Sequence, residues 1–151
     1  RELWRSLEVS PHDGPPILLI TVRAMRALAA GEAPERVLAH FNWSLLSALG
    51  LEPVVTECVA SGAEPSGKVE VAFSLHEMGL LAPPHSQHRS DLVRITPRTL
   101  MALQALAIGT AGDNIEVDAY AGASSLLAWL VAMQGGRRLR TFAALDPARP
   151  L

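Results

Sequence analysis

Proline and glycine residues divide this sequence into helical segments on either side of a long stretch without helical periodicity. In the helical segments, apolar residues recur at three- and four-residue intervals, which predicts amphipathic helices with one buried face. Prolines open several of these segments and glycines follow them, as helix ends favour. The predicted helices are Arg1–Val9, Ile17–Ala30, Pro34–Leu49, a helix that follows the N-cap Thr96 and ends before Gly109, and Ile115–Met133.

Two of these helices differ in where their apolar residues lie. The helix Ile17–Ala30 has a wide apolar face that includes Leu18, Met25 and Leu28, with its arginines on the opposite side. The last helix is apolar around nearly its whole circumference in its second half, which predicts a position deep in the bundle.

The stretch Leu51–Ser90 has four prolines, several glycines and only short β-like runs. VEVAF (Val69–Phe73) alternates in polarity, and MGLLA (Met78–Ala82) can pair with it across a turn. So long a stretch without a helix indicates a small subdomain or insertion. We therefore predict a mainly α fold, a helical bundle with a small irregular β-containing insertion, divided into residues 1–50, 51–90 and 91–151.

Composition excludes several classes of protein. An apolar content of 49% rules out a disordered chain. The net charge of −2 means that any nucleic-acid role must come from local patches or from further sequence. The single cysteine, Cys58, excludes a disulfide framework and is typical of a reducing compartment. No run is apolar enough to span a bilayer and no signal peptide opens the chain. Because a helical pattern starts at once at Arg1, we expect a piece of a longer protein.

Catalytic motifs are absent from the sequence. There is no nucleophile elbow, no phosphate-binding Gly-rich loop and no dinucleotide fingerprint. Cys58 lies in TECVASG, which matches no catalytic-cysteine context, and a lone cysteine is commonly a small buried apolar residue. The acids Asp113, Glu116 and Asp118 lie at a predicted helix start, where the helix dipole alone favours them. We therefore predict that this protein is not an enzyme.

Potential metal ligands cluster in the Pro/Gly-rich stretch, where Cys58, His76, His85 and His88 lie. Structural zinc requires four cysteine or histidine ligands, usually in two close pairs. His85 and His88 have the spacing of one pair, but Cys58 has Ser61 where its partner would be. Because this set is incomplete, we predict no zinc and no other cofactor.

Arginines form the remaining candidate site. Arg137, Arg138 and Arg140 follow a predicted helix end, where the helix dipole by itself favours cations. Arg94 and Arg98 form a second basic stretch, near Arg89. Their functional interpretation is contact with phosphate, or capture of an acidic peptide by a basic-rimmed apolar groove. Arginine suits both, because its planar guanidinium binds carboxylate or phosphate through two hydrogen bonds.

Four segments, in order, resemble the RecO family of bacterial recombination mediators and DNA repair proteins. HFNWSLLSALGLEPVVTECVASGAEP (His40–Pro65) resembles the family's leucine-rich helix end and first zinc knuckle. VAFSLHEMGLLAPPH (Val71–His85) resembles its second knuckle. RITPRTLMALQAL (Arg94–Leu106) and LLAWLVAMQGGRRLRTFAAL (Leu126–Leu145) resemble the helices that follow.

The sequence departs from the family pattern in two respects. The family's N-terminal OB-fold, a small barrel that binds single-stranded nucleic acid, is not in this chain. The four zinc-cysteine positions of the family fall on Cys58, Ser61, Ala82 and His85, of which one is still cysteine. The resemblance therefore implies the helical domain and a degenerate knuckle held by packing.

The resemblance implies a non-catalytic function in a bacterial cytoplasm, in association with the nucleoid. RecO proteins bind single- and double-stranded DNA, anneal complementary strands and act with RecR. They help RecA to load onto single strands covered by single-strand-binding protein, whose acidic C-terminal tail is a docking partner. Arg137, Arg138 and Arg140 are then the first candidate contacts with DNA or an acidic peptide, followed by Arg94 and Arg98. No membrane partner is implied.

A helical interaction or scaffold domain without a nucleic-acid role is the alternative. The net charge of −2 favours this alternative for the fragment taken alone. A salt titration of DNA binding separates the two hypotheses, because a mediator has a negative slope and a scaffold has none.

Overall fold

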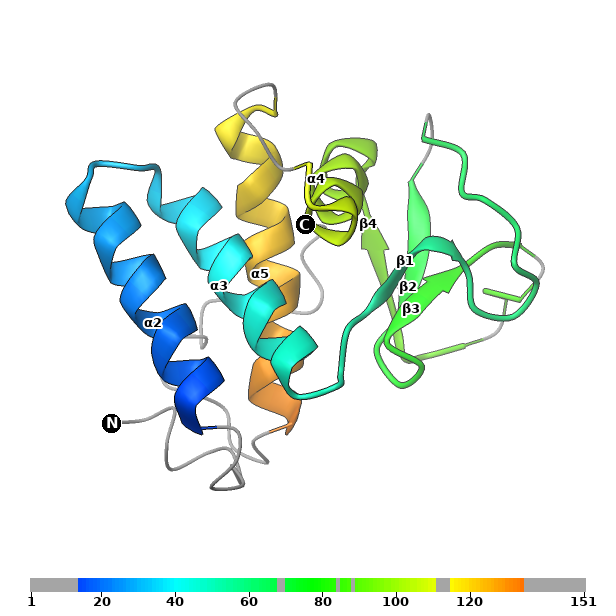
Figure 1. The fold of residues 1–151 in the computed structure, drawn as a ribbon. Coiled ribbons are helices and arrows are strands. Elements are labelled where there is room, and N and C mark those ends of the chain that lie inside the picture. The colour runs from blue at the N-terminus through cyan, green and yellow to red at the C-terminus, as the bar shows by residue number, and fades with distance from the viewer. Residues whose placement is uncertain (1–13, 68–69, 84, 88, 111–114, 135–151) are drawn as a thin grey trace.

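The computed structural model describes residues 14–67, 70–83, 85–87, 89–110 and 115–134 as four helices and a four-stranded sheet (Figure 1). The predicted helix Arg1–Val9 lies outside the described residues. The elements are α2 (Gly14–Ala29), α3 (Pro34–Ala48), β1 (Val54–Cys58), β2 (Val71–Ser74), β3 (Gly79–Leu81), β4 (Leu92–Ile95), α4 (Pro97–Ile108) and α5 (Val117–Gln134).

The four described helices begin and end within a few residues of the predicted positions. Pro34 opens α3, and Gly50, with φ 69°, follows its end. Gly50 N–H donates to Ser47 O (3.0 Å) and Leu51 N–H donates to Leu46 O (2.8 Å), so two carbonyls of the last turn are satisfied. At α4 the Thr96 side chain accepts a hydrogen bond from Thr99 N–H (3.2 Å), which confirms the predicted N-cap.

α5 lies at the centre of the helical layer, where it packs against α3 and α4, while α2 packs against the outer side of α3 (Figure 1). The sequence pattern of α5 predicts this burial, since Leu126, Leu127, Leu130 and Val131 are all buried. The prediction for α2 is wrong in detail: Leu18, Met25 and Leu28 are exposed, and Ile17 enters the core instead. A helix at the edge of a layer has one packed side, so part of its apolar surface stays in solvent.

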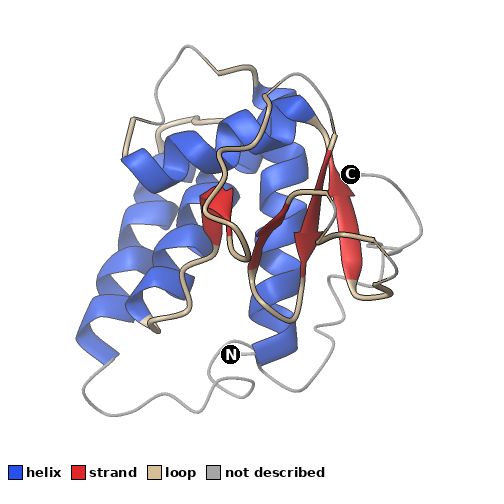
Figure 2. Cartoon of the chain, turned by 90° about the vertical axis from the view of Figure 1, so that its right-hand side faces the viewer, coloured by secondary structure: helices blue, strands red, loops and turns tan. Residues whose placement is uncertain are grey.

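The strands form one mixed sheet in the order β1-β3-β2-β4, next to α4 (Figure 2). β2 pairs antiparallel with β3, as the sequence predicts, and also antiparallel with β4, whereas β1 runs parallel to β3. The Gln104 side chain of α4 donates to Val55 O of β1 (3.2 Å), which joins the helices to the sheet.

This sheet corrects the predicted fold class. The fold is mixed α/β, not a helical bundle with an irregular insertion, because four hydrogen-bonded strands share the core of the helices. Phe73, Leu80 and Ile95 of the sheet belong to the same buried cluster as the leucines of α4 and α5. β1 and β4 lack the polar alternation that identifies a strand, so the sequence analysis did not predict them. The predicted division into three segments stays a prediction.

A polar network joins the β2–β3 turn to the start of β4. Arg89 donates to both carboxylate oxygens of Asp91 (3.0 Å each), to Glu77 Oε1 (2.6 Å) and to Ser74 Oγ (3.3 Å). Ser74 Oγ in turn donates to Asp91 Oδ2 (2.7 Å). The hydrogen bonds from Arg89, followed by the one from Ser74, hold the pKa of Asp91 far below its usual range.

We expect Asp91→Asn to lower the urea midpoint at neutral pH, because it removes the charge that Arg89 binds. A carboxylate with a depressed pKa contributes stability above its unfolded pKa of about 4, and this contribution is lost as the pH falls further. The difference in urea midpoint between wild type and Asp91→Asn should therefore be constant from neutral pH to about pH 5 and should become smaller below about pH 4. Urea midpoints at about pH 7 and pH 3 measure it, and an equal gap at both values would contradict the assignment.

Candidate functional site

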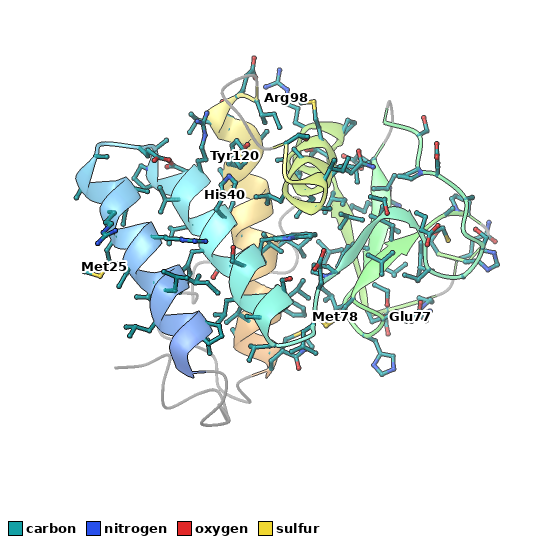
Figure 3. All side chains as sticks on the ribbon, in the orientation of Figure 1. Met25, His40, Glu77, Met78, Arg98 and Tyr120 are labelled. Atoms are coloured by element: carbon teal, nitrogen blue, oxygen red, sulfur yellow. The ribbon has the colours of Figure 1, made fainter. Side chains whose placement is uncertain are left out.

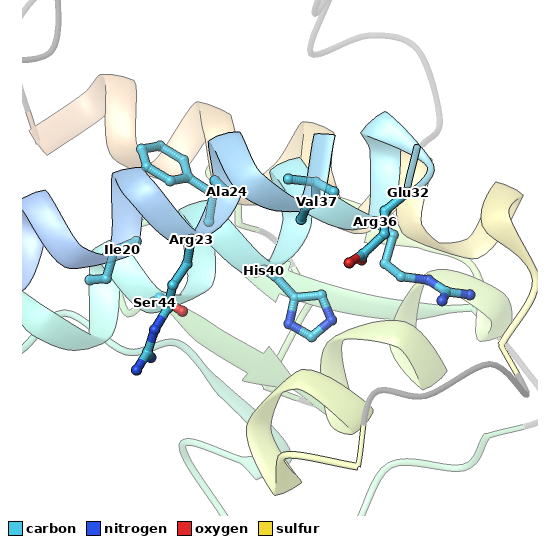
Figure 4. Close-up of a pocket in the computed structure, with 10 residues that line it drawn as sticks. Ile20, Arg23, Ala24, Glu32, Arg36, Val37, His40 and Ser44 are labelled. Atoms are coloured by element: carbon cyan, nitrogen blue, oxygen red, sulfur yellow. The ribbon is translucent and has the colours of Figure 1, made fainter. Parts of the chain in front are cut away.

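A groove of about 700 Å³ runs between α2 and α3 (Figure 4). It combines an apolar floor with charged side chains at its sides. Its lining residues are Ile20, Arg23, Ala24, Ala27, Glu32, Arg36, Val37, His40, Phe41 and Ser44.

The floor of the groove follows from the small residues of α2. Ala24 and Ala27 lie one turn apart on the side of α2 that faces α3, and their short side chains leave space between the two helices. Val37 of α3 is buried, and Phe41 is half-buried against the core one turn further along. An apolar side chain of a ligand can therefore replace water over this floor.

The titratable side chains of the groove are two arginines, one histidine and one glutamate. Arg23 comes from α2, and Arg36 and His40 come from α3, where they are four residues apart and share a helix face. In Figure 4 the three side chains project to the same side of the helix pair, with Glu32 near Arg36. Two arginines against one glutamate favour an anionic ligand.

Tyr120 of α5 contacts two of the side chains that line the groove, His40 and Arg36. It is fully buried, and its ring is stacked with the ring of His40 at a centroid distance of 6.1 Å and an interplanar angle of 28° (Figure 3). The guanidinium carbon of Arg36 lies 5.4 Å from the centroid of the Tyr120 ring, within the range of a cation–π contact. One buried aromatic ring thus positions both groups.

The electrostatics of the groove act on His40. Burial, followed by the positive charge of Arg36, lowers the pKa of His40, and the negative charge of Glu32 opposes this shift. His40 is therefore predominantly neutral at neutral pH and can act as a hydrogen-bond donor or acceptor.

Among the arginines that the sequence analysis names as candidate contacts, the two in the described part of the chain, Arg94 and Arg98, do not line this groove. Arg94 lies on β4 with its side chain 80% exposed and its Nη1 3.9 Å from Glu70 Oε2. Arg98 lies in the first turn of α4, 3.3 Å from Glu116 Oε2, and is also exposed. Arg137, Arg138 and Arg140 lie outside the described residues. Their assignment as contacts stays a prediction.

The sequence analysis missed Arg23, Arg36 and His40 as site residues. The i, i+4 spacing of Arg36 and His40 is visible in the sequence, but by itself it does not indicate a site. The site forms only because the packing of α2 on α3 brings Arg23 into the same groove. A site formed between two helices has no linear motif.

Comparison with known proteins identifies the family. The family model described as "Recombination protein O C terminal" matches residues 11–140. The chain belongs to the RecO family. The DNA repair protein RecO of Anaeromyxobacter sp. (strain Fw109-5) is 32% identical over 155 residues, which cover 100% of this chain and 59% of that relative. This RecO-family chain therefore spans about three fifths of that relative's length. No solved structure matches it.

The predicted membership of the RecO family is thereby confirmed. The next question is where the structure places the four positions that correspond to the family's zinc-knuckle cysteines. Cys58 is buried, and its Sγ accepts a hydrogen bond from Ala82 N–H (3.2 Å), so the two halves of the expected knuckle are adjacent. Ser61 lies in the turn after β1, where its N–H donates to Cys58 O (3.3 Å). His85 is exposed.

The donor set at these positions does not fit zinc. Cys58 supplies one thiol, Ala82 has no ligating atom and a serine hydroxyl is a poor ligand for zinc. Within the described residues, no group of three histidine, cysteine or acidic side chains is arranged to hold a metal ion. Burial raises the pKa of the Cys58 thiol, but hydrogen bonds from Ala82 and Ser61 outweigh it and lower the pKa to about 7. The thiol is thus held by backbone and side-chain donors.

A helix that crosses a membrane has to be both long and apolar. None of the described helices combines the length and the apolar character that a membrane span needs.

Proposed function

We propose that this chain is the C-terminal portion of a non-catalytic recombination mediator, and that its α2–α3 groove binds the acidic C-terminal tail of single-strand-binding protein. Membership of the RecO family supports the role in DNA repair and recombination. The observation that carries the assignment of the groove is that Arg23 and Arg36 both line it, beside an apolar floor.

The chemistry of the groove fits an acidic peptide with an apolar end. Carboxylates of the peptide would pair with Arg23 and Arg36, while an apolar side chain would cover Ala24, Ala27 and Phe41. Charge-assisted hydrogen bonds at a half-open groove are screened by salt, whereas burial of the apolar side chain is not. Both parts of the peptide are therefore needed for binding.

DNA contact is a separate part of the proposal. Arg94 and Arg98, together with Arg137, Arg138 and Arg140, are the proposed phosphate contacts. Glu70 and Glu116 lie beside the first two and reduce their attraction for phosphate. We therefore expect this chain alone to bind DNA weakly, and the main DNA site, like the contact with RecR, to need the rest of the protein.

We expect a fluorescent peptide of four aspartates followed by a C-terminal phenylalanine to bind, and its affinity to fall severalfold between about 50 and 200 mM salt. A peptide in which alanine replaces the phenylalanine is the matched control and should bind at least about tenfold more weakly, as expected for the loss of one buried aromatic side chain. Fluorescence anisotropy measures both affinities. Equal affinity for the two peptides would contradict the groove as the site.

A helical scaffold domain without a nucleic-acid role is the second candidate, which the net charge of −2 favours. The same salt titration with single-stranded DNA discriminates between the candidates. A mediator has an affinity that falls with salt, and a scaffold has no measurable affinity at any salt concentration.

A further inference from the structure

We propose that His40 couples occupation of the α2–α3 groove to the uptake of a proton, so that an acidic ligand binds more tightly as the pH falls from about 7.5 to 6. This inference rests on the proposed function of the groove and adds a regulatory property to it. The groove then responds to pH in the physiological range, where histidine is the side chain that titrates.

The position of His40 is the first part of the argument. It lines the groove from the middle of α3, together with Arg36 one turn before it and Arg23 on the opposing helix α2 (Figure 4). One face of its ring is stacked on buried Tyr120, which holds the imidazole half-buried at the side of the groove. A ligand that covers the floor must therefore pass close to the ring.

The charges around His40 are the second part. α2 contributes Arg23, the turn between α2 and α3 contributes Glu32, α3 contributes Arg36, and α5 contributes the uncharged ring of Tyr120. Burial disfavours a positive charge on His40, the positive charge of Arg36 disfavours it further, and the negative charge of Glu32 opposes both effects. In the ligand-free groove these effects lower the pKa of His40 and favour its neutral form.

An acidic ligand reverses this balance. Its carboxylates neutralise the field of Arg23 and Arg36 and add negative charge beside the imidazole, which favours the protonated form. Because linkage is reciprocal, a ligand that promotes protonation of His40 is itself bound more tightly when His40 is protonated. A rise of about one pKa unit on binding corresponds to an affinity up to about tenfold higher below the free pKa than above the bound pKa.

The test is a titration of the aspartate–phenylalanine peptide at pH values from about 6 to 7.5, where the peptide's own carboxylates stay ionised. We expect Kd to fall severalfold as the pH is lowered, with net proton uptake seen by calorimetry in buffers of different ionisation enthalpy. His40→Gln, which retains hydrogen-bonding capacity but does not titrate, should bind with a Kd independent of pH.

Each outcome decides one of the two proposals. Peptide binding with no dependence on pH, or a pH dependence that persists in His40→Gln, overturns the role of His40 and leaves the groove as the peptide site. No binding at any pH overturns the proposed function and the role of His40 with it. The imidazole resonances of His40, followed by NMR with and without peptide, measure the change in its pKa independently of affinity.

Discussion

The double charge reversal Arg23→Glu/Arg36→Glu should weaken binding of the acidic peptide by at least about hundredfold. Each arginine contributes a charge-assisted hydrogen bond of about 1.5–3 kcal/mol, and each glutamate adds repulsion of the ligand carboxylates. Because about 1.4 kcal/mol is a factor of ten in affinity, two such losses bring binding close to the detection limit. Anisotropy titrations at low salt measure the loss.

Arg26→Glu is the matched control for this experiment. Arg26 is also an exposed arginine of α2, but it does not line the groove. We expect this variant to bind the peptide within a few-fold of wild type, although it changes the net charge in the same direction. A loss as large in Arg26→Glu as in the double variant Arg23→Glu/Arg36→Glu would assign the effect to overall charge and would contradict the groove as the binding site. Circular dichroism checks that each variant is folded. This matters most for the double variant, because Arg36 contacts the buried ring of Tyr120.

The second large effect concerns the knuckle that the family resemblance implies. We expect the triple substitution Ser61→Cys/Ala82→Cys/His85→Cys to create a stoichiometric zinc site together with Cys58. The strands already bring Cys58 next to Ala82, and residues Ala82, Pro83 and Ser86 line one cavity of about 320 Å³ with Cys58. Four thiolates bind zinc tetrahedrally, and the binding free energy adds to the stability of the folded state.

Cobalt absorption and elemental zinc content measure the engineered site, and the melting temperature should rise when zinc is added to the triple variant but not to wild type. The double substitution Ser61→Cys/His85→Cys, which leaves Ala82 without a ligating atom, is the control and should bind zinc more weakly. If the triple variant has no tetrahedral thiolate absorption, the segments around residues 58 and 82 are not a knuckle that has lost its ligands.

The helices could be predicted from the sequence because local chemistry determines where they begin and end. Pro34 fixes φ in the first turn of α3, the Thr96 side chain accepts a hydrogen bond from the first turn of α4, and Gly50 N–H closes the last turn of α3. These effects are local, so they need no tertiary information. The β2–β3 pairing was predictable for a similar reason, since the two strands are close in sequence. By contrast, β1 pairs in parallel with β3 across a long connection. β4 follows β3 in the sequence but pairs with β2, on the edge of β2 that faces away from β3. Such partners cannot be inferred from periodicity.

The candidate site was less predictable than the fold. Arginines that are neighbours in sequence, such as Arg94 and Arg98, lie on separate elements and each has a glutamate beside it. Arg23 and Arg36 are separated by a helix end and a turn, yet they line one groove. Charge density along the sequence is therefore a poor guide to charge density on the surface, because helix packing decides which side chains meet.

The contacts of Tyr120 limit how far this protein can be shortened while the groove keeps its arrangement. Arg36 and His40 of α3 take their positions from an aromatic residue that lies much later in the chain, on the central helix. A minimal fragment made of the α2–α3 hairpin would keep every lining residue and still lose the arrangement that makes the groove selective. Recognition here is a property of the assembled helical layer, so it should be acquired late in folding and lost early on unfolding.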